Sequence, residues 1–226
     1  MLSVAKIQEY MQEAIELFRQ VMPLPVPDIS YAVATKSKLN SVVEEQTRLV
    51  EAICSEDCCA REWAGKTFPG NKGIAIVVRQ SYATGKTMLR YILWHEMGHA
   101  YAFAHESSEK FWDMDLLYED TIAYHFWQEV VANFISLNVA IRTGTPVGIP
   151  TGRSLKQALA GNIRELAYYC SEAYFTGIHA NAPKEFNDLA NMMIEKLHQE
   201  RYWEIDMSWI NSVKLQIERI RKLQVE

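Results

Sequence analysis

The sequence predicts an α+β protein that is predominantly helical and contains one small β-sheet. Apolar residues recur with helical periodicity over most of the 226 residues. The run from Ile74 to Val78 is apolar and mostly β-branched, is bounded by turn residues, and has the strongest strand pattern in the chain. Hydrophobic residues make up 49% and charged residues 23% of the sequence, values typical of a folded globular protein.

The N-terminal part is expected to combine helices with strands. Residues 3–22 carry apolar side chains at three- and four-residue spacing, which predicts an amphipathic helix that Pro23 ends. Residues 29–36 predict a short strand, and residues 41–53 predict a helix. Residues 54–72 are expected to be irregular because glycine and proline interrupt them.

Long helices are expected in the rest of the chain. Residues 86–104 and 118–141 predict two helices that a polar loop over 105–116 separates. The segment 143–152 is rich in Gly and Pro and has the composition of a linker. We therefore expect a core with its N-terminal helix over 1–142, a linker over 143–152, and a helical subdomain over 153–226 with helices near 153–175, 183–200 and 207–224.

Charge and hydropathy exclude two classes of partner. The chain has 23 basic and 28 acidic residues and shows no dense basic cluster, so nucleic acid is not expected to bind. No apolar run approaches the roughly 20 residues that span a bilayer, and the N-terminus does not have the pattern of a signal peptide. A cytoplasmic location is therefore expected. The sequence does not indicate an oligomeric state.

The four cysteines predict reduced thiols rather than a disulfide framework. Cys54, Cys58 and Cys59 lie close together in the sequence and are a candidate second metal site. No partner pair stands at the spacing of a zinc finger, so this interpretation is the weaker one.

The most informative residues are His95-Glu96-Met97-Gly98-His99, an H-E-x-x-H motif inside the predicted helix 86–104. Residues four apart lie on one face of a helix, so both imidazoles can bind the same ion. Glu96 is rotated by about 100° from His95, and it can therefore contact a water at the metal without binding the metal itself. A carboxylate in that position can take a proton from the water and later deliver it to a leaving amine.

A catalytic zinc site needs a third protein ligand, and two candidates compete. His105 completes the metzincin spacing, but Ala102 stands where that pattern has the glycine that ends the helix. With the helix continuing, His105 would face away from His99. Glu129 lies among apolar residues on the next predicted helix, where a buried carboxylate needs a partner, and it is the favoured ligand.

Two neighbours of Glu129 on the same helix are candidates for supporting roles. Asn133 lies one turn after Glu129, and its side-chain oxygen can accept the second ring N–H of a ligating histidine. His125 lies one turn before Glu129 and is a candidate donor to the oxyanion, although a purely structural role is equally compatible with its spacing. The sequence leaves the oxyanion donor open.

The motif H-E-M-G-H followed by E-V-V-A-N-F resembles the gluzincin metallopeptidases, the zincin group that includes thermolysin, and most closely the small bacterial ImmA/IrrE-type peptidases. The resemblance covers roughly residues 70–140 and rests on these two motifs. It implies a zincin-like fold in which a small sheet packs on the helix of the first motif. It also implies that strand 74–79 is an edge strand along which an extended peptide pairs its backbone.

The same resemblance implies a set of site residues and an activity. His95, His99 and Glu129 would bind one Zn²⁺ ion, Glu96 would act as general base and acid, and Asn133 would orient the site. The expected function is zinc-dependent hydrolysis of peptide bonds in a peptide or protein substrate, with Glu96 activating the water. The alternative is a zincin-shaped regulatory or binding module that has the metal site and little or no peptidase activity.

Overall fold

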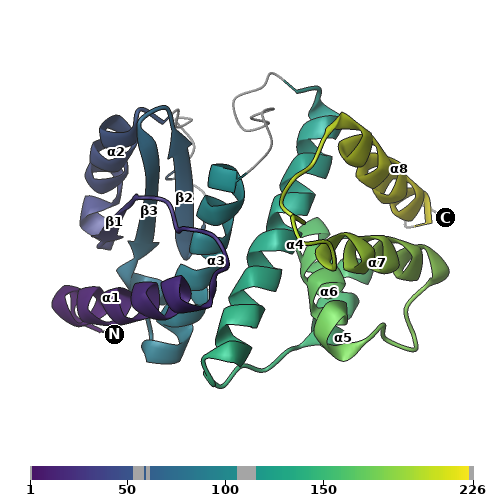
Figure 1. Cartoon of the computed structure of the whole chain (residues 1–226), viewed down its shortest axis with the longest axis horizontal. Coiled ribbons are helices and arrows are strands. Elements are labelled where there is room, and N and C mark those ends of the chain that lie inside the picture. The colour runs from purple at the N-terminus through teal and green to yellow at the C-terminus, as the bar shows by residue number, and fades with distance from the viewer. Residues whose placement is uncertain (1, 53–58, 60–61, 106–115, 224–226) are drawn as a thin grey trace. The chain divides into compact units, whose positions relative to one another are not determined.

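The computed structural model describes residues 2–52, 59, 62–105 and 116–223. Helices predominate there, and a single three-stranded sheet accompanies them, as Figure 1 shows. The chain divides into two compact units, Met1–Ala104 with Ile135–Val147, and His105–Phe134 with Gly148–Glu226. Helix α4 (Tyr118–Arg142) contributes residues to both units. The predicted division into a core over 1–142, a linker over 143–152 and a helical subdomain over 153–226 stays a prediction.

The sheet of the first unit has the strand order β1-β3-β2. Strand β3 (Gly73–Arg79) lies in the centre, parallel to β1 (Ile29–Ala34) and antiparallel to β2 (Gly65–Gly70). The expectation that strand 74–79 is an edge strand is therefore wrong. Its unbroken apolar run is the pattern of a strand buried on both faces, which belongs in the middle of a sheet.

Strand β2 corrects the expectation that residues 54–72 are irregular. It forms a hairpin with β3 through the two-residue turn Asn71–Lys72. Pro69 is tolerated because β2 lies at an edge of the sheet, where a missing N–H breaks no ladder bond. Gly70 is required because a Cβ there would lie 2.2 Å from the backbone oxygen of Val50.

Three helices surround this sheet. Helix α2 (Leu39–Val50) packs on β1 and β3, and Figure 1 shows α3 (Lys86–His105) on the opposite side of the sheet. Helix α1 (Val4–Val21) begins at Ser3, whose hydroxyl accepts the Lys6 N–H, and it receives a hydrogen bond of 2.9 Å from the Trp94 indole to the Ala14 carbonyl. That bond attaches α3 to α1.

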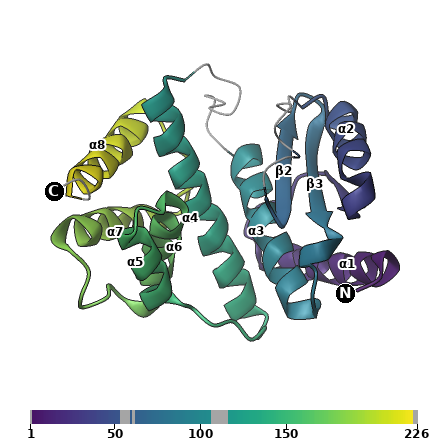
Figure 2. The same cartoon turned by 180° about the vertical axis from the view of Figure 1, so that it is seen from behind.

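Helices are the only regular secondary structure among the described residues of the second unit. It contains the first part of α4 together with α5 to α8, which Figure 2 shows from behind. The single helix predicted over 153–175 is broken into two, because Gly161 adopts a φ of 90° and Asn162 caps the next helix with its side chain. The bounds of these helices are α5 Thr151–Leu159, α6 Ile163–Thr176, α7 Lys184–Leu197 and α8 Met207–Leu223.

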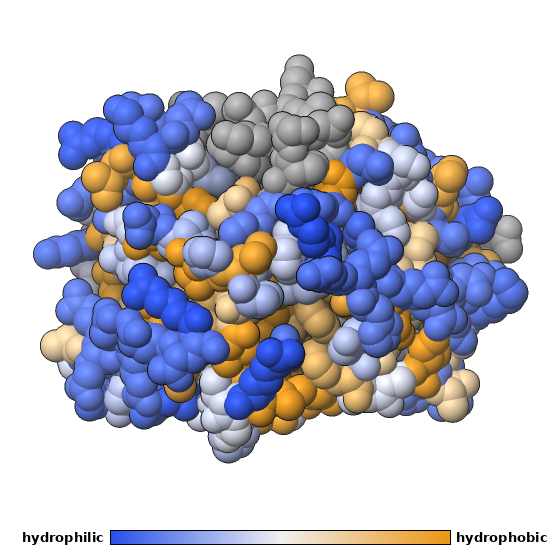
Figure 3. All heavy atoms as spheres, viewed as in Figure 1, coloured by the Kyte–Doolittle hydropathy of each residue, from blue (hydrophilic) through white to orange (hydrophobic). Residues whose placement is uncertain are grey.

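The surface is largely hydrophilic on the face that Figure 3 shows. Large apolar side chains are also exposed at scattered positions, such as Leu117 at 72% and Leu215 at 55%. Among the helices described, none is long and apolar enough to cross a membrane.

Candidate metal centre

Helix α3 presents His95 and His99 from a rigid scaffold. The helix runs without a break from Lys86 to His105, so the sharp exit that a metzincin needs at Ala102 is absent from this helix. Trp94, Met97 and Tyr101 are completely buried, and the Tyr101 hydroxyl accepts the N–H of Leu24 at 3.1 Å. Core packing on this side fixes the rotation of the helix and therefore the direction of both imidazoles.

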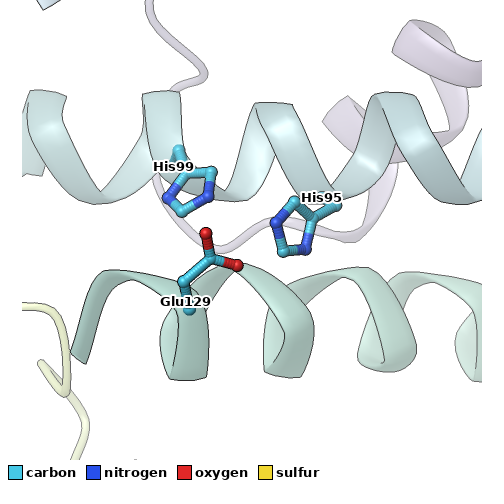
Figure 4. A group of neighbouring side chains, drawn as sticks. All are labelled: His95, His99 and Glu129. Carbon is cyan, nitrogen blue, oxygen red and sulfur yellow. The ribbon is translucent and has the colours of Figure 1, made fainter. Parts of the chain in front are cut away.

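His95, His99 and Glu129 come together in the structure. One potential ligand atom from each residue lies within 4.8 Å of the other two. Figure 4 shows the two imidazoles on α3 and the Glu129 carboxylate pointing toward them from the neighbouring helix. The rings of His95 and His99 are 4.8 Å apart and nearly perpendicular, so the two side chains occupy one side of α3 without stacking.

The last part of α4 is attached to α3 inside the first unit. Ser136 and Tyr91 both belong to that unit, and the Ser136 hydroxyl donates to the Tyr91 carbonyl at 3.4 Å. Glu129 precedes Ser136 by two helical turns on the same continuous helix. His95 and His99 follow Tyr91 by about one and two turns on α3.

The chemistry of this group fits a zinc ion. Two neutral imidazoles and one carboxylate are a common ligand set of catalytic zinc, and they leave a fourth position for solvent or substrate. Ligand atoms bound to one tetrahedral zinc lie roughly 3.4 Å apart. The observed separations, up to 4.8 Å, therefore exceed this distance by no more than about 1.4 Å.

Glu129 also has a cationic neighbour in its own unit. The Arg164 guanidinium on α6 lies 3.4 Å from Oε1 of Glu129, and the two side chains are 59% and 19% exposed. An ion pair of this exposure contributes at most about 1 kcal/mol. Zinc binding at Glu129 can therefore compete with it.

Glu96 is held against the sheet rather than exposed to solvent. The residue is 8% exposed, and the Thr67 hydroxyl lies 2.8 Å from its Oε2 and 2.9 Å from its backbone carbonyl oxygen. A Cβ at Gly65, two residues earlier on β2, would lie 2.6 Å from Cγ of Glu96. The strand β2 thus approaches the Glu96 side chain closely at two alternate positions.

The other predicted site residues have different neighbours. Asn133 is completely buried, and its amide nitrogen donates to Ser171 at 2.7 Å. The predicted acceptance of a histidine N–H by its side-chain oxygen stays a prediction.

His125 is exposed and lies beside the Tyr124 ring, and His105 lies 6.0 Å from the Trp203 ring. Neither joins the His95, His99 and Glu129 group. Of the predicted cysteine cluster, Cys54 and Cys58 fall outside the described residues.

Sequence reasoning missed Thr67, Gly65 and Arg164. The signal for the first two was the Gly-Lys-Thr-Phe-Pro-Gly segment followed directly by a two-residue turn and the strongest strand, which is a hairpin pattern. Arg164 follows Asn162, a typical N-cap residue, but nothing in the sequence links it to Glu129.

In comparisons with known proteins, the chain matches no family model, and no similar curated protein or solved structure was found.

Proposed function

We propose that the protein is a zinc-dependent metallopeptidase of the gluzincin type with a zincin-like fold. The observation that carries the proposal is the convergence of His95, His99 and Glu129, with Glu96 following the first ligand directly in the sequence. When bound, zinc lowers the pKa of water toward 7 and polarises a carbonyl group. These residues would hold it through two imidazole nitrogens and one carboxylate.

The role of Glu96 in this proposal is proton transfer. Its carboxylate takes a proton from the attacking water while the water oxygen bonds to the carbonyl carbon of the peptide. The C–N bond then breaks, and the same proton passes to the amine nitrogen that leaves. No external reactant other than water is needed, and Glu96 returns to its starting state.

The edge of the sheet beside Glu96 supports a peptide substrate. Arg79 N–H donates to the Ala64 carbonyl at 2.9 Å, which makes this pair a hydrogen-bonded one in the antiparallel ladder of β2 and β3. Because such pairing alternates, Gly65 and Thr67 direct their backbone groups away from β3. An extended peptide can add to these groups as a further strand, which would place its backbone next to Glu96.

A peptide-cleavage assay with the full chain tests this function. The zinc-loaded protein is expected to cleave members of a fluorogenic peptide library, and chelator treatment is expected to abolish cleavage until zinc is restored. Glu96→Gln is expected to retain one zinc per chain and to lose turnover. Glu195→Gln changes an exposed glutamate on α7 and serves as the matched control.

The outcomes separate the proposal from its main alternative. Full activity of Glu96→Gln, or cleavage that persists without metal, would show that this site does not perform the reaction. Stoichiometric zinc without cleavage of any library peptide would instead support a regulatory or binding module.

A further inference from the structure

Glu96 is a carboxylate with little solvent contact, and such a group must be held by hydrogen bonds. The structure supplies a donor from a distant part of the chain, since Thr67 on β2 lies next to Glu96 on α3. Both residues belong to the same compact unit. Their relationship is therefore a property of one packed core.

The Thr67 hydroxyl contacts two acceptors of the same residue. Its oxygen is 2.8 Å from Oε2 and 2.9 Å from the backbone carbonyl oxygen of Glu96. The hydroxyl has one proton, which these two acceptors share, and its contact with both ends of Glu96 restricts the side-chain torsions between them. The hydroxyl therefore holds the Glu96 carboxylate in a fixed place relative to the backbone of α3.

Gly65 limits the movement of Glu96 from the same strand. The place that a Cβ of Gly65 would occupy is 2.6 Å from Cγ of Glu96 and 2.9 Å from Cγ2 of Ile92. Real Cβ atoms do not approach other atoms this closely, so β2 fits against α3 because a hydrogen replaces the side chain there. The aliphatic part of Glu96 packs on Gly65 while its carboxylate meets Thr67.

We infer that Thr67 is a positioning residue for Glu96. Its hydroxyl holds Oε2, so that Oε1 is directed toward the reacting water. This inference rests on the peptidase function proposed above. A carboxylate has two oxygens, so one can be held while the other accepts a proton. Because β2 also presents backbone groups of Gly65 and Thr67 at the edge, one strand aligns both the base and the paired peptide.

Three threonine variants of the full zinc-loaded chain test this role. Thr67→Val removes the hydroxyl and keeps the branched shape, whereas Thr67→Ser keeps the hydroxyl. Thr47→Val is the matched control, because Thr47 is also buried in the first unit and its hydroxyl donates to a backbone carbonyl at 2.9 Å. The measurements are kcat and KM for a library peptide, zinc content, and crystal structures of the variants.

The expected result is selective for the chemical step. Thr67→Val lowers kcat by at least about tenfold with KM within about twofold, as expected for an outer partner of a catalytic group. It retains one zinc per chain, and its crystal structure shows a rotated Glu96 carboxylate. Thr67→Ser restores at least half of kcat and the original carboxylate orientation. Thr47→Val leaves kcat unchanged.

Three results would overturn the inference. They are an unchanged kcat in Thr67→Val, an equal loss in Thr67→Ser, or a Glu96 carboxylate that keeps its place without the hydroxyl. If the wild-type chain cleaves no peptide, the peptidase proposal fails by that measurement alone. The carboxylate positions in the crystal structures then decide the positioning role independently.

Discussion

The carboxylate of Glu129 lies 3.4 Å from the guanidinium of Arg164 while it also faces the imidazoles of His95 and His99. One of the two carboxylate oxygens that could bind zinc, Oε1, is thus also paired with an exposed cation. Arginine keeps its charge at every accessible pH, so the competition does not depend on protonation of the arginine.

Replacement of Arg164 is therefore expected to strengthen zinc binding. Arg164→Gln should raise the zinc affinity by up to about fivefold, which corresponds to the at most about 1 kcal/mol that an exposed ion pair contributes. Competition with a fluorescent chelator measures the affinity. Arg164→Lys, which keeps the charge, should remain within about twofold of the wild type. Weaker binding in Arg164→Gln would show that Arg164 supports the zinc site.

The identity of the third zinc ligand can be tested by metal content. Glu129→Gln should lower the zinc affinity by more than the about 10–100-fold that loss of an outer partner costs. His105→Asn should keep the wild-type affinity, because its ring lies beside Trp203. Inductively coupled plasma mass spectrometry after dialysis gives the stoichiometry. The reverse pattern would favour the metzincin arrangement.

Ser171 is expected to stabilise the second unit through Asn133. Its hydroxyl accepts the Asn133 amide at 2.7 Å and donates to the Tyr168 carbonyl at 2.9 Å, and both Ser171 and Asn133 are completely buried. Ser171→Ala should lower the free energy of unfolding by about 1–3 kcal/mol, because it removes the acceptor of a buried amide. Urea unfolding measures this change. Ser212→Ala, at a half-buried serine bonded within α8, should change it by less than about 0.5 kcal/mol.

Glu172 should make stability depend on pH. Burial raises its pKa from 4.5 to about 7, against the opposing effect of the Ser154 hydroxyl, and the residue is 2% exposed. Below pH 4.5 the carboxyl is protonated in both states. Between pH 4.5 and 7 the unfolded chain releases the proton that the folded chain keeps, so the free energy of unfolding falls as pH rises.

Glu172→Gln isolates this contribution from those of other titrating groups. The stability of the wild type relative to this variant should fall by about 3 kcal/mol between pH 4 and pH 8. Urea unfolding of both proteins at several pH values measures the difference. A difference that does not change with pH would mean that Glu172 titrates normally.

The elements that depend on local patterns were predictable from the sequence. The helix that carries His95 and His99 was predicted because its apolar residues and motif lie within one continuous segment. The strand β3 was also predicted from its composition, although its place in the sheet was not. An apolar run identifies a buried strand, but strand order depends on pairings between distant segments.

The features that depend on tertiary contacts were not predictable. Strand β2 exists because β3 pairs with it, and its glycine and proline residues gave the pattern of a loop when considered alone. The hydrogen bond from Thr67 to Glu96 joins two segments whose contact is set by packing of β2 against α3. The break at Gly161 was missed because an apolar pattern on both sides of it resembles one helix.

Pro69 limits how far another molecule can extend this sheet. By the same alternation that turns Gly65 and Thr67 outward, the Pro69 nitrogen faces the free side of β2 and has no hydrogen to donate. An incoming strand thus meets two donors and then an interruption. Such interrupted edges oppose edge-to-edge pairing between chains, which leads to aggregation. The edge can therefore pair with a short extended peptide while resisting growth of a continuous intermolecular sheet.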